Sequence, residues 1–80
     1  MNRGEAIQTL REIIRVCVDN GMAINYVDLT PIQLNNGLLS YQLKIGTRLN
    51  YVCRNSLLPY LKESNLKLEE NEDHIIVLSH

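Results

Sequence analysis

The first part of the chain carries apolar residues at the spacing of an amphipathic helix. At 100° per residue, one arc collects the apolar positions while charged and amide side chains occupy the opposite face. Val16 falls outside this arc, and Asn20 and Gly21 are residues that commonly end a helix. The pattern predicts a helix from about Arg3 to Asn20 that lies on a core formed with Ala6, Ile7, Leu10, Ile13, Ile14, Cys17 and Val18.

After Gly21 the period of the apolar positions changes to two, which is typical of strands. The pattern predicts a first strand over residues 22–29. Thr30-Pro31 either ends this strand or makes a bulge in it, because proline cannot donate a ladder hydrogen bond. Whether the strand continues over residues 32–34 stays open. Asn35-Asn36-Gly37 predict a hairpin turn, since Asn and Gly tolerate positive φ. A second strand over residues 38–45 follows, and its core face carries Leu39, Tyr41, Leu43 and Ile45.

A second helix is expected from Arg48 to about Ser64, with Thr47 as its N-cap. Pro59 interrupts the pattern, because it removes one helical hydrogen bond and clashes with the preceding turn. The helix therefore either kinks at Pro59 or restarts with Ser56 as a new N-cap, and both alternatives stay open. The expected core arc of this helix contains Leu49, Val52, Cys53, Leu57 and Tyr60.

The last segment predicts a closing hairpin. Residues 66–69 and 74–78 form its arms, and the polar residues 70–73 form its turn. The order is α-β-β-α-β-β. It predicts one small α+β domain over residues 1–80, in which two helices pack on one face of a four-stranded, mainly antiparallel sheet.

Composition supports a folded domain, because 45% of the residues are hydrophobic and 21% are charged. The chain contains neither Phe nor Trp, and small aliphatic cores are often completed by a partner subunit. Polar residues interrupt the N-terminal pattern, so no signal peptide is expected, and no apolar run approaches the roughly 20 residues that cross a bilayer. We therefore expect a cytoplasmic protein with no membrane contact.

The charges are sorted along the chain. Residues 29–62 contain no Asp or Glu, whereas five acidic residues follow in residues 63–80. On a continuous second helix, Arg48, Tyr51, Asn55, Leu58 and Lys62 would form an outward stripe, which Lys44 and Arg54 would widen. This surface suggests contact with a phosphate backbone. Two other interpretations are a solvated helix face and a pairing with the acidic hairpin, within the monomer or on a second copy.

Catalytic and metal-binding patterns are absent from the sequence. Cys17 and Cys53 fall within apolar patterns, where buried free thiols are common, and a structural disulfide is not expected. No closely spaced ligand pair involves His74 or His80. No nucleophile elbow or phosphate-cradling loop occurs, and the acidic run at residues 69–73 has the character of a solvated turn. We expect no catalytic residue, no cofactor and no metal.

These observations predict a non-catalytic protein-interaction or self-associating module. Its contact surface would be the sheet edge or the uncovered sheet face, and its partner another protein or a second copy. Leu38, Leu58 and Val16, which miss the core arcs, are candidates for an apolar patch. The alternative is a weak nucleic-acid-binding domain that uses residues 29–62, although a pI near 6.0 is low for that class. For either partner, the candidate contacts are Lys44, Arg48, Tyr51, Arg54, Asn55, Leu58 and Lys62.

Overall fold

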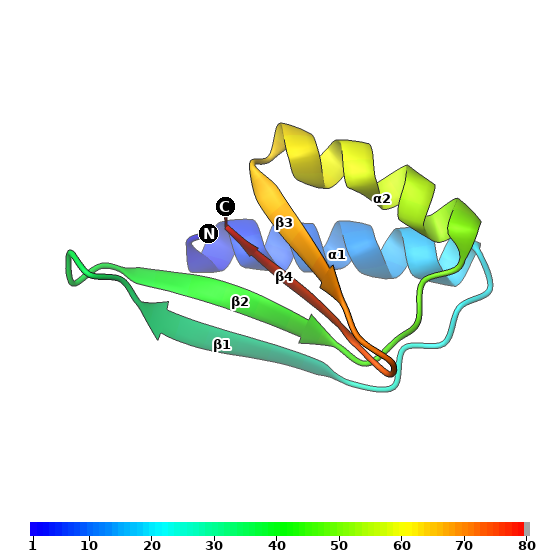
Figure 1. The fold of residues 1–80 in the computed structure, drawn as a ribbon, viewed down its shortest axis with the longest axis horizontal. Helices are drawn as coiled ribbons and strands as arrows, with labels where there is room; N and C mark the ends of the chain where they lie inside the picture. Colours follow the sequence, from blue (N-terminus) through cyan, green and yellow to red (C-terminus); the bar gives the residue numbers. More distant parts are fainter. Residues whose placement is uncertain (80) are drawn as a thin grey trace.

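Two helices and a four-stranded antiparallel sheet make up the structure, a computed structural model that describes residues 1–79. The strand order is β1-β2-β4-β3, and both helices pack against the sheet (Figure 1). The predicted α+β class and the α-β-β-α-β-β order are confirmed. The elements are α1 (Arg3–Asp19), β1 (Val27–Gln33), β2 (Leu39–Ile45), α2 (Tyr51–Glu63), β3 (Leu66–Glu70) and β4 (Ile75–Ser79).

A capping box starts α1. The side chain of Asn2 accepts the N–H of Glu5 at 2.8 Å, and the Glu5 carboxylate accepts the N–H of Asn2 at 3.1 Å. The predicted buried face of this helix is wrong at three positions, because Thr9 and Val16 are buried and Val18 is 59% exposed. The buried face is turned toward Thr9 and Val16, since α2 as well as the sheet packs against α1.

Strand β1 differs from its prediction in two ways. It begins at Val27, because the backbone of residues 22–24 is held elsewhere, with the Thr47 hydroxyl donating to the carbonyl of Ala23 at 2.7 Å. It then continues through Pro31 without a break. The N–H of Leu34 donates to the carbonyl of Leu38, so the alternation of antiparallel pairs directs the even residues of β1 toward β2. Pro31 therefore stands where no ladder donor is needed.

The predicted turn at Asn35-Asn36-Gly37 is confirmed, and Gly37 has a φ of +83°. The hairpin of β1 and β2 extends beyond the N-terminal end of α1 (Figure 1). Leu39, predicted to face the core, is 59% exposed at this end. We call this exposed apolar end the hairpin tip, and it consists of Ile32, Leu34, Leu38 and Leu39.

Helix α2 begins later than predicted. Its N-cap is Asn50, whose side chain accepts the N–H of Cys53 at 2.8 Å, and Thr47 does not cap it. The helix runs through Pro59 to Glu63, so Ser56 starts no second helix. Val52, predicted to face the core, is 56% exposed, because the buried face of this helix follows the 53, 57 and 61 positions.

The closing hairpin has slightly shifted bounds. Strand β3 extends to Glu70, and β4 occupies Ile75–Ser79, so His74 belongs to the turn. The N–H of Asn71 donates to the carbonyl of His74 at 2.9 Å and closes the hairpin.

The core lies between the sheet and the two helices and is entirely aliphatic apart from two thiols. Its buried members are Ala6, Ile13, Val16, Cys17, Leu43, Ile45, Leu49, Cys53, Leu57, Leu61, Leu66, Ile75 and Val77.

Gly46 provides space for an aromatic ring. A Cβ atom at this position would lie 2.4 Å from two ring carbons of Tyr26, and Lys44 Nζ is 5.9 Å from the centroid of the same ring. We expect Gly46→Ala to lower the free energy of unfolding by about 1–3 kcal/mol, because the ring must leave its position. Denaturant unfolding measures this cost. In a Tyr26→Ala background the cost should fall close to zero, and an equal cost in both backgrounds would contradict the steric explanation.

Candidate functional site

The stripe predicted on the second helix is present in part. Tyr51, Asn55, Leu58 and Lys62 are exposed on α2 at spacings of four, three and four residues, with Tyr51 75% exposed. Arg48 is exposed as well, but it precedes the helix and belongs to the connection after β2. The helical part of the stripe is therefore a continuous outer surface of α2.

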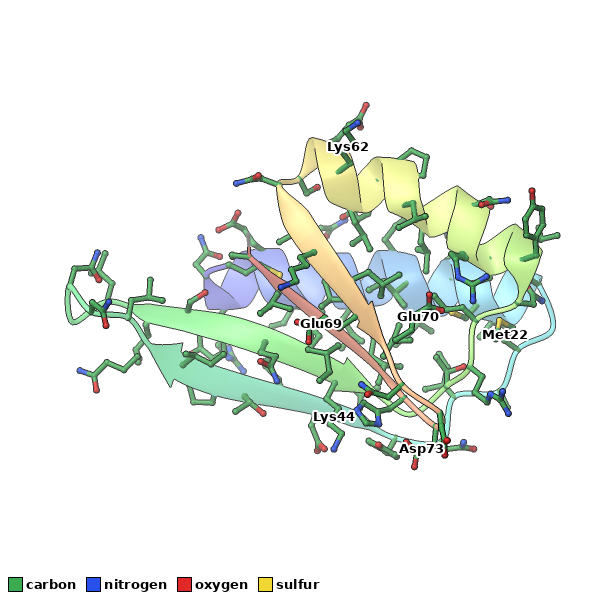
Figure 2. The ribbon with its side chains drawn as sticks, in the orientation of Figure 1. Met22, Lys44, Lys62, Glu69, Glu70 and Asp73 are labelled. Atoms are coloured by element: carbon green, nitrogen blue, oxygen red, sulfur yellow. The ribbon has the colours of Figure 1, made fainter. Side chains whose placement is uncertain are left out.

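The basic residues do not form one surface: Arg48 and Arg54 line a common pocket with Glu70, whereas Lys44 and Lys62 lie far apart (Figure 2). Figure 2 shows Lys62 at the C-terminal end of α2 and Lys44 on the far side of the molecule. Lys44 is directly opposite Asp28 in the sheet register and lies near the Tyr26 ring. Lys44 therefore has Asp28 and Tyr26 as nearby partners. Because Lys44 and Lys62 lie on opposite sides of the molecule, they do not form one phosphate-binding surface.

Arg54 joins the acid-free segment to the acidic hairpin within the monomer. Its Nε is 2.9 Å from Glu70 Oε2 and its Nη2 is 2.8 Å from Glu70 Oε1, in a two-point ion pair. Nη2 also donates to the carbonyl of Leu49 at 3.3 Å. The hydrogen bond with Glu70 raises the pKa of Arg54. Arg54 thus connects α2 to β3, with its charge already matched.

A groove runs between α2 and the outer edge of β3. Its volume is about 370 Å³, and we call it the α2–β3 groove. Leu58 is 43% exposed along it, and its lining contains two lysines and no carboxylate. The complete lining is Leu58, Leu61 and Lys62 from α2, and Leu66, Lys67 and Leu68 from β3.

The backbone of β3 presents unpaired groups along this edge. The Asn71 to His74 hydrogen bond places the odd residues of β3 in register to pair with β4. The N–H and C=O groups of Leu66, Leu68 and Glu70 therefore point away from the sheet, because β3 is an edge strand. A row of outward backbone groups is a template for an additional strand.

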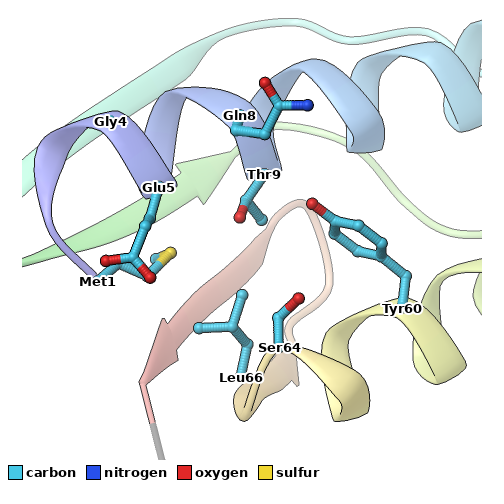
Figure 3. A pocket seen from close by; sticks show the side chains of 8 residues that line it. All are labelled: Met1, Gly4, Glu5, Gln8, Thr9, Tyr60, Ser64 and Leu66. Atoms are coloured by element: carbon cyan, nitrogen blue, oxygen red, sulfur yellow. The ribbon is translucent and has the colours of Figure 1, made fainter.

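A second pocket of about 360 Å³ lies between the start of α1 and the end of α2 (Figure 3). Thr9, Tyr60 and Ser64 supply hydroxyl groups to its wall, and Glu5 supplies the one carboxylate. That carboxylate caps α1 through the N–H of Asn2. Within residues 1–79, no hydrogen bond joins this carboxylate to the hydroxyl of Thr9, Tyr60 or Ser64, so no hydroxyl in the wall is paired with a base.

The two cysteines meet inside the core, which their distance in the sequence does not indicate. Their Sγ atoms are 3.3 Å apart, and both thiols are free and fully buried between α1 and α2. Desolvation, and then the hydrogen bond with Cys53, raises the pKa of Cys17 to about 12. A thiol held in its neutral form is a poor nucleophile.

The histidine of the closing turn has polar neighbours. Its Nδ1 lies 2.7 Å from Asp73 Oδ1 and its Nε2 lies 3.1 Å from Asn71 Nδ2. The hydrogen bond with His74 lowers the pKa of Asp73. Within residues 1–79 no three His, Cys, Asp or Glu side chains gather as a metal site, and His80 lies outside the described residues.

The three apolar candidates have different outcomes. Val16 is buried, which corrects its assignment to a surface patch, whereas Leu38 and Leu58 are exposed. They lie on separate surfaces, the hairpin tip and the α2–β3 groove. Sequence reasoning missed Leu68 and Lys67 as groove residues. The available signal was Leu58, an apolar residue at an outward position of a helix that is followed directly by a strand.

Neither helix within residues 1–79 combines the length and the apolar character needed to cross a membrane. Comparisons with protein-family models, with curated proteins and with solved structures find no match.

Proposed function

We propose that this protein is a non-catalytic protein-interaction module that binds an extended segment of another chain beside β3. One observation carries the proposal: the outward backbone groups of Leu66, Leu68 and Glu70 border a groove with a leucine-rich wall. Strand addition uses such a combination, because backbone hydrogen bonds supply affinity and alternate side chains enter the adjacent groove.

The opposite edge of the sheet is less suited to this role. In β1 the outward positions include Pro31, which has no N–H to offer to a new strand. An added strand would lose a hydrogen bond at the middle of β1. The β3 edge has no proline, so it is the better template of the two.

The position of α2 favours a segment of another protein over a second copy. Figure 1 shows α2 lying past the outer edge of β3. A second copy pairing along β3 would bring its own α2 to the same place, so the two helices would collide. An extended segment fits beside β3 without this conflict. Nucleic-acid binding stays a prediction, and the separation of Lys44 from Lys62 weighs against it.

Three labelled peptides test the proposal. Each is about nine residues long with capped ends, and valine alternates with glutamate, threonine or lysine, so that all three present the pattern of an added strand. Binding is measured by fluorescence anisotropy, and amide chemical shifts locate it. We expect at least one peptide to bind and to shift the amides of Leu66, Leu68 and Glu70. The proposal fails if no peptide binds or if the shifts lie elsewhere.

Two proline variants make the test specific to the edge. Leu68→Pro removes an outward N–H without removing a bond to β4, so it should weaken binding by about tenfold or more. Gln33→Pro makes the same change at an outward position of β1 and should leave binding unchanged. Circular dichroism verifies that both variants are folded. Equal binding by the two variants would place the contact away from β3.

A further inference from the structure

We infer that the segment taken up by the α2–β3 groove alternates apolar with acidic residues, and that its acidic side chains lie beside Lys67 on the open face of the sheet. This inference rests on the proposed function, since it names the chemistry of the partner at the same site. It follows from the charges and faces of the groove.

The groove differs in charge from the part of β3 that lies beyond it, at Glu70. Near Leu66 its lining carries Lys62 and Lys67 and no carboxylate. Near Glu70 the arginine of α2 is already neutralised, because Arg54 and Glu70 form their two-point ion pair. An incoming acid therefore finds two lysines in the groove, and Lys67 is held only by its exposed ion pair with Glu69.

Lys67 has a partner that an incoming acid can replace. Its Nζ lies 3.3 Å from Glu69 Oε1, and the two side chains are 49% and 44% exposed. Exposed ion pairs of this kind contribute little stability, because water and salt screen them. A carboxylate on an adjacent strand would share the Lys67 ammonium at small cost.

The alternation follows from the two faces of the sheet. Side chains of a strand added to β3 point in turn toward the helices and toward the open face. On the helix side they meet Leu58, Leu61 and Leu68, which favour apolar residues. On the open side they meet Lys67, which favours an acid across the strands. The groove thus selects an extended apolar and acidic segment.

The three peptides used above also test this inference. We expect the glutamate peptide to bind about tenfold more tightly than the threonine peptide, and the lysine peptide to bind most weakly. The glutamate preference should shrink as salt concentration rises. Equal affinities for all three would overturn the acidic inference and leave the proposed function standing, whereas binding by none would remove both.

Charge variants locate the preference. Lys67→Gln should lower the affinity for the glutamate peptide several-fold and leave the affinity for the threonine peptide almost unaffected. Glu69→Gln removes the ion-pair partner of Lys67 and should raise the affinity for the glutamate peptide. Lys44→Gln is the matched control, since Lys44 lies away from the groove. Loss of the preference in the Lys44 variant, or displacement of the glutamate peptide by a single-stranded oligonucleotide, would contradict the inference.

Discussion

Replacing Pro59 with alanine is expected to stabilise the protein by about 2 kcal/mol. Pro59 lies inside α2, where it cannot donate to the carbonyl of Asn55 and its ring crowds that carbonyl. Proline costs about 3 kcal/mol relative to alanine in a helix interior, and the loss of its restriction on the unfolded chain returns about 1 kcal/mol. Pro59 is exposed, so the substitution leaves no cavity. Guanidinium unfolding at equilibrium measures the difference.

Pro31→Ala is the matched control. Pro31 is also exposed, but its missing N–H points away from the sheet, so alanine gains no ladder hydrogen bond there. We expect its free energy of unfolding to change by less than about 1 kcal/mol, toward lower stability. If Pro59→Ala has no larger effect than Pro31→Ala, then α2 accommodates its proline without cost, contrary to this account.

Alkylation of the native thiols is expected to be extremely slow. Burial raises the pKa of Cys17 from 9.0 to about 12, so its thiolate at pH 8 is about a thousandfold rarer than that of an ordinary thiol. The rate with iodoacetamide should still rise about tenfold between pH 10 and pH 11, where a thiol with the ordinary pKa of 9.0 has almost levelled off, because only the thiolate reacts. Mass spectrometry of timed samples gives the rate.

Two controls separate burial from intrinsic reactivity. The same chain in guanidinium should react at both cysteines at the ordinary rate. A Gln33→Cys variant carries an exposed thiol and should be modified once under native conditions, at the new position. Rapid native modification of Cys17 or Cys53 would show that α1 and α2 separate easily, which the 3.3 Å contact between their Sγ atoms does not predict.

Local patterns predicted the elements, whereas positions that depend on neighbours were missed. The period of 3.6 in α1 and the Asn-Gly turn are properties of short segments, and both were predicted. The rotation of α1 that buries Val16 and exposes Val18 depends on α2, which lies far along the chain. Thr47 and Asn50 are both good N-cap residues. Asn50 caps α2, whereas the Thr47 hydroxyl donates to the carbonyl of Ala23.

The candidate site was also predictable only where it depends on a single element. The helical spacing of Tyr51, Asn55, Leu58 and Lys62 correctly indicated an outer surface on α2. The groove beside that surface requires the packing of α2 on β3, and residue spacing within a single element does not encode it. In the sequence, Arg54 and Lys62 are both basic residues of the acid-free segment. The structure distinguishes them, because Arg54 forms an ion pair with Glu70 that connects α2 to β3.

Pro31 also limits what the protein can assemble into. With proline at the middle of β1, the sheet has one edge that readily accepts a strand, and the edge at β3 is consumed when a segment binds there. Filament growth needs two available edges on each molecule. The complex should therefore contain one protein and one segment, and a proline on the edge opposite the groove keeps such a complex from growing into a fibre.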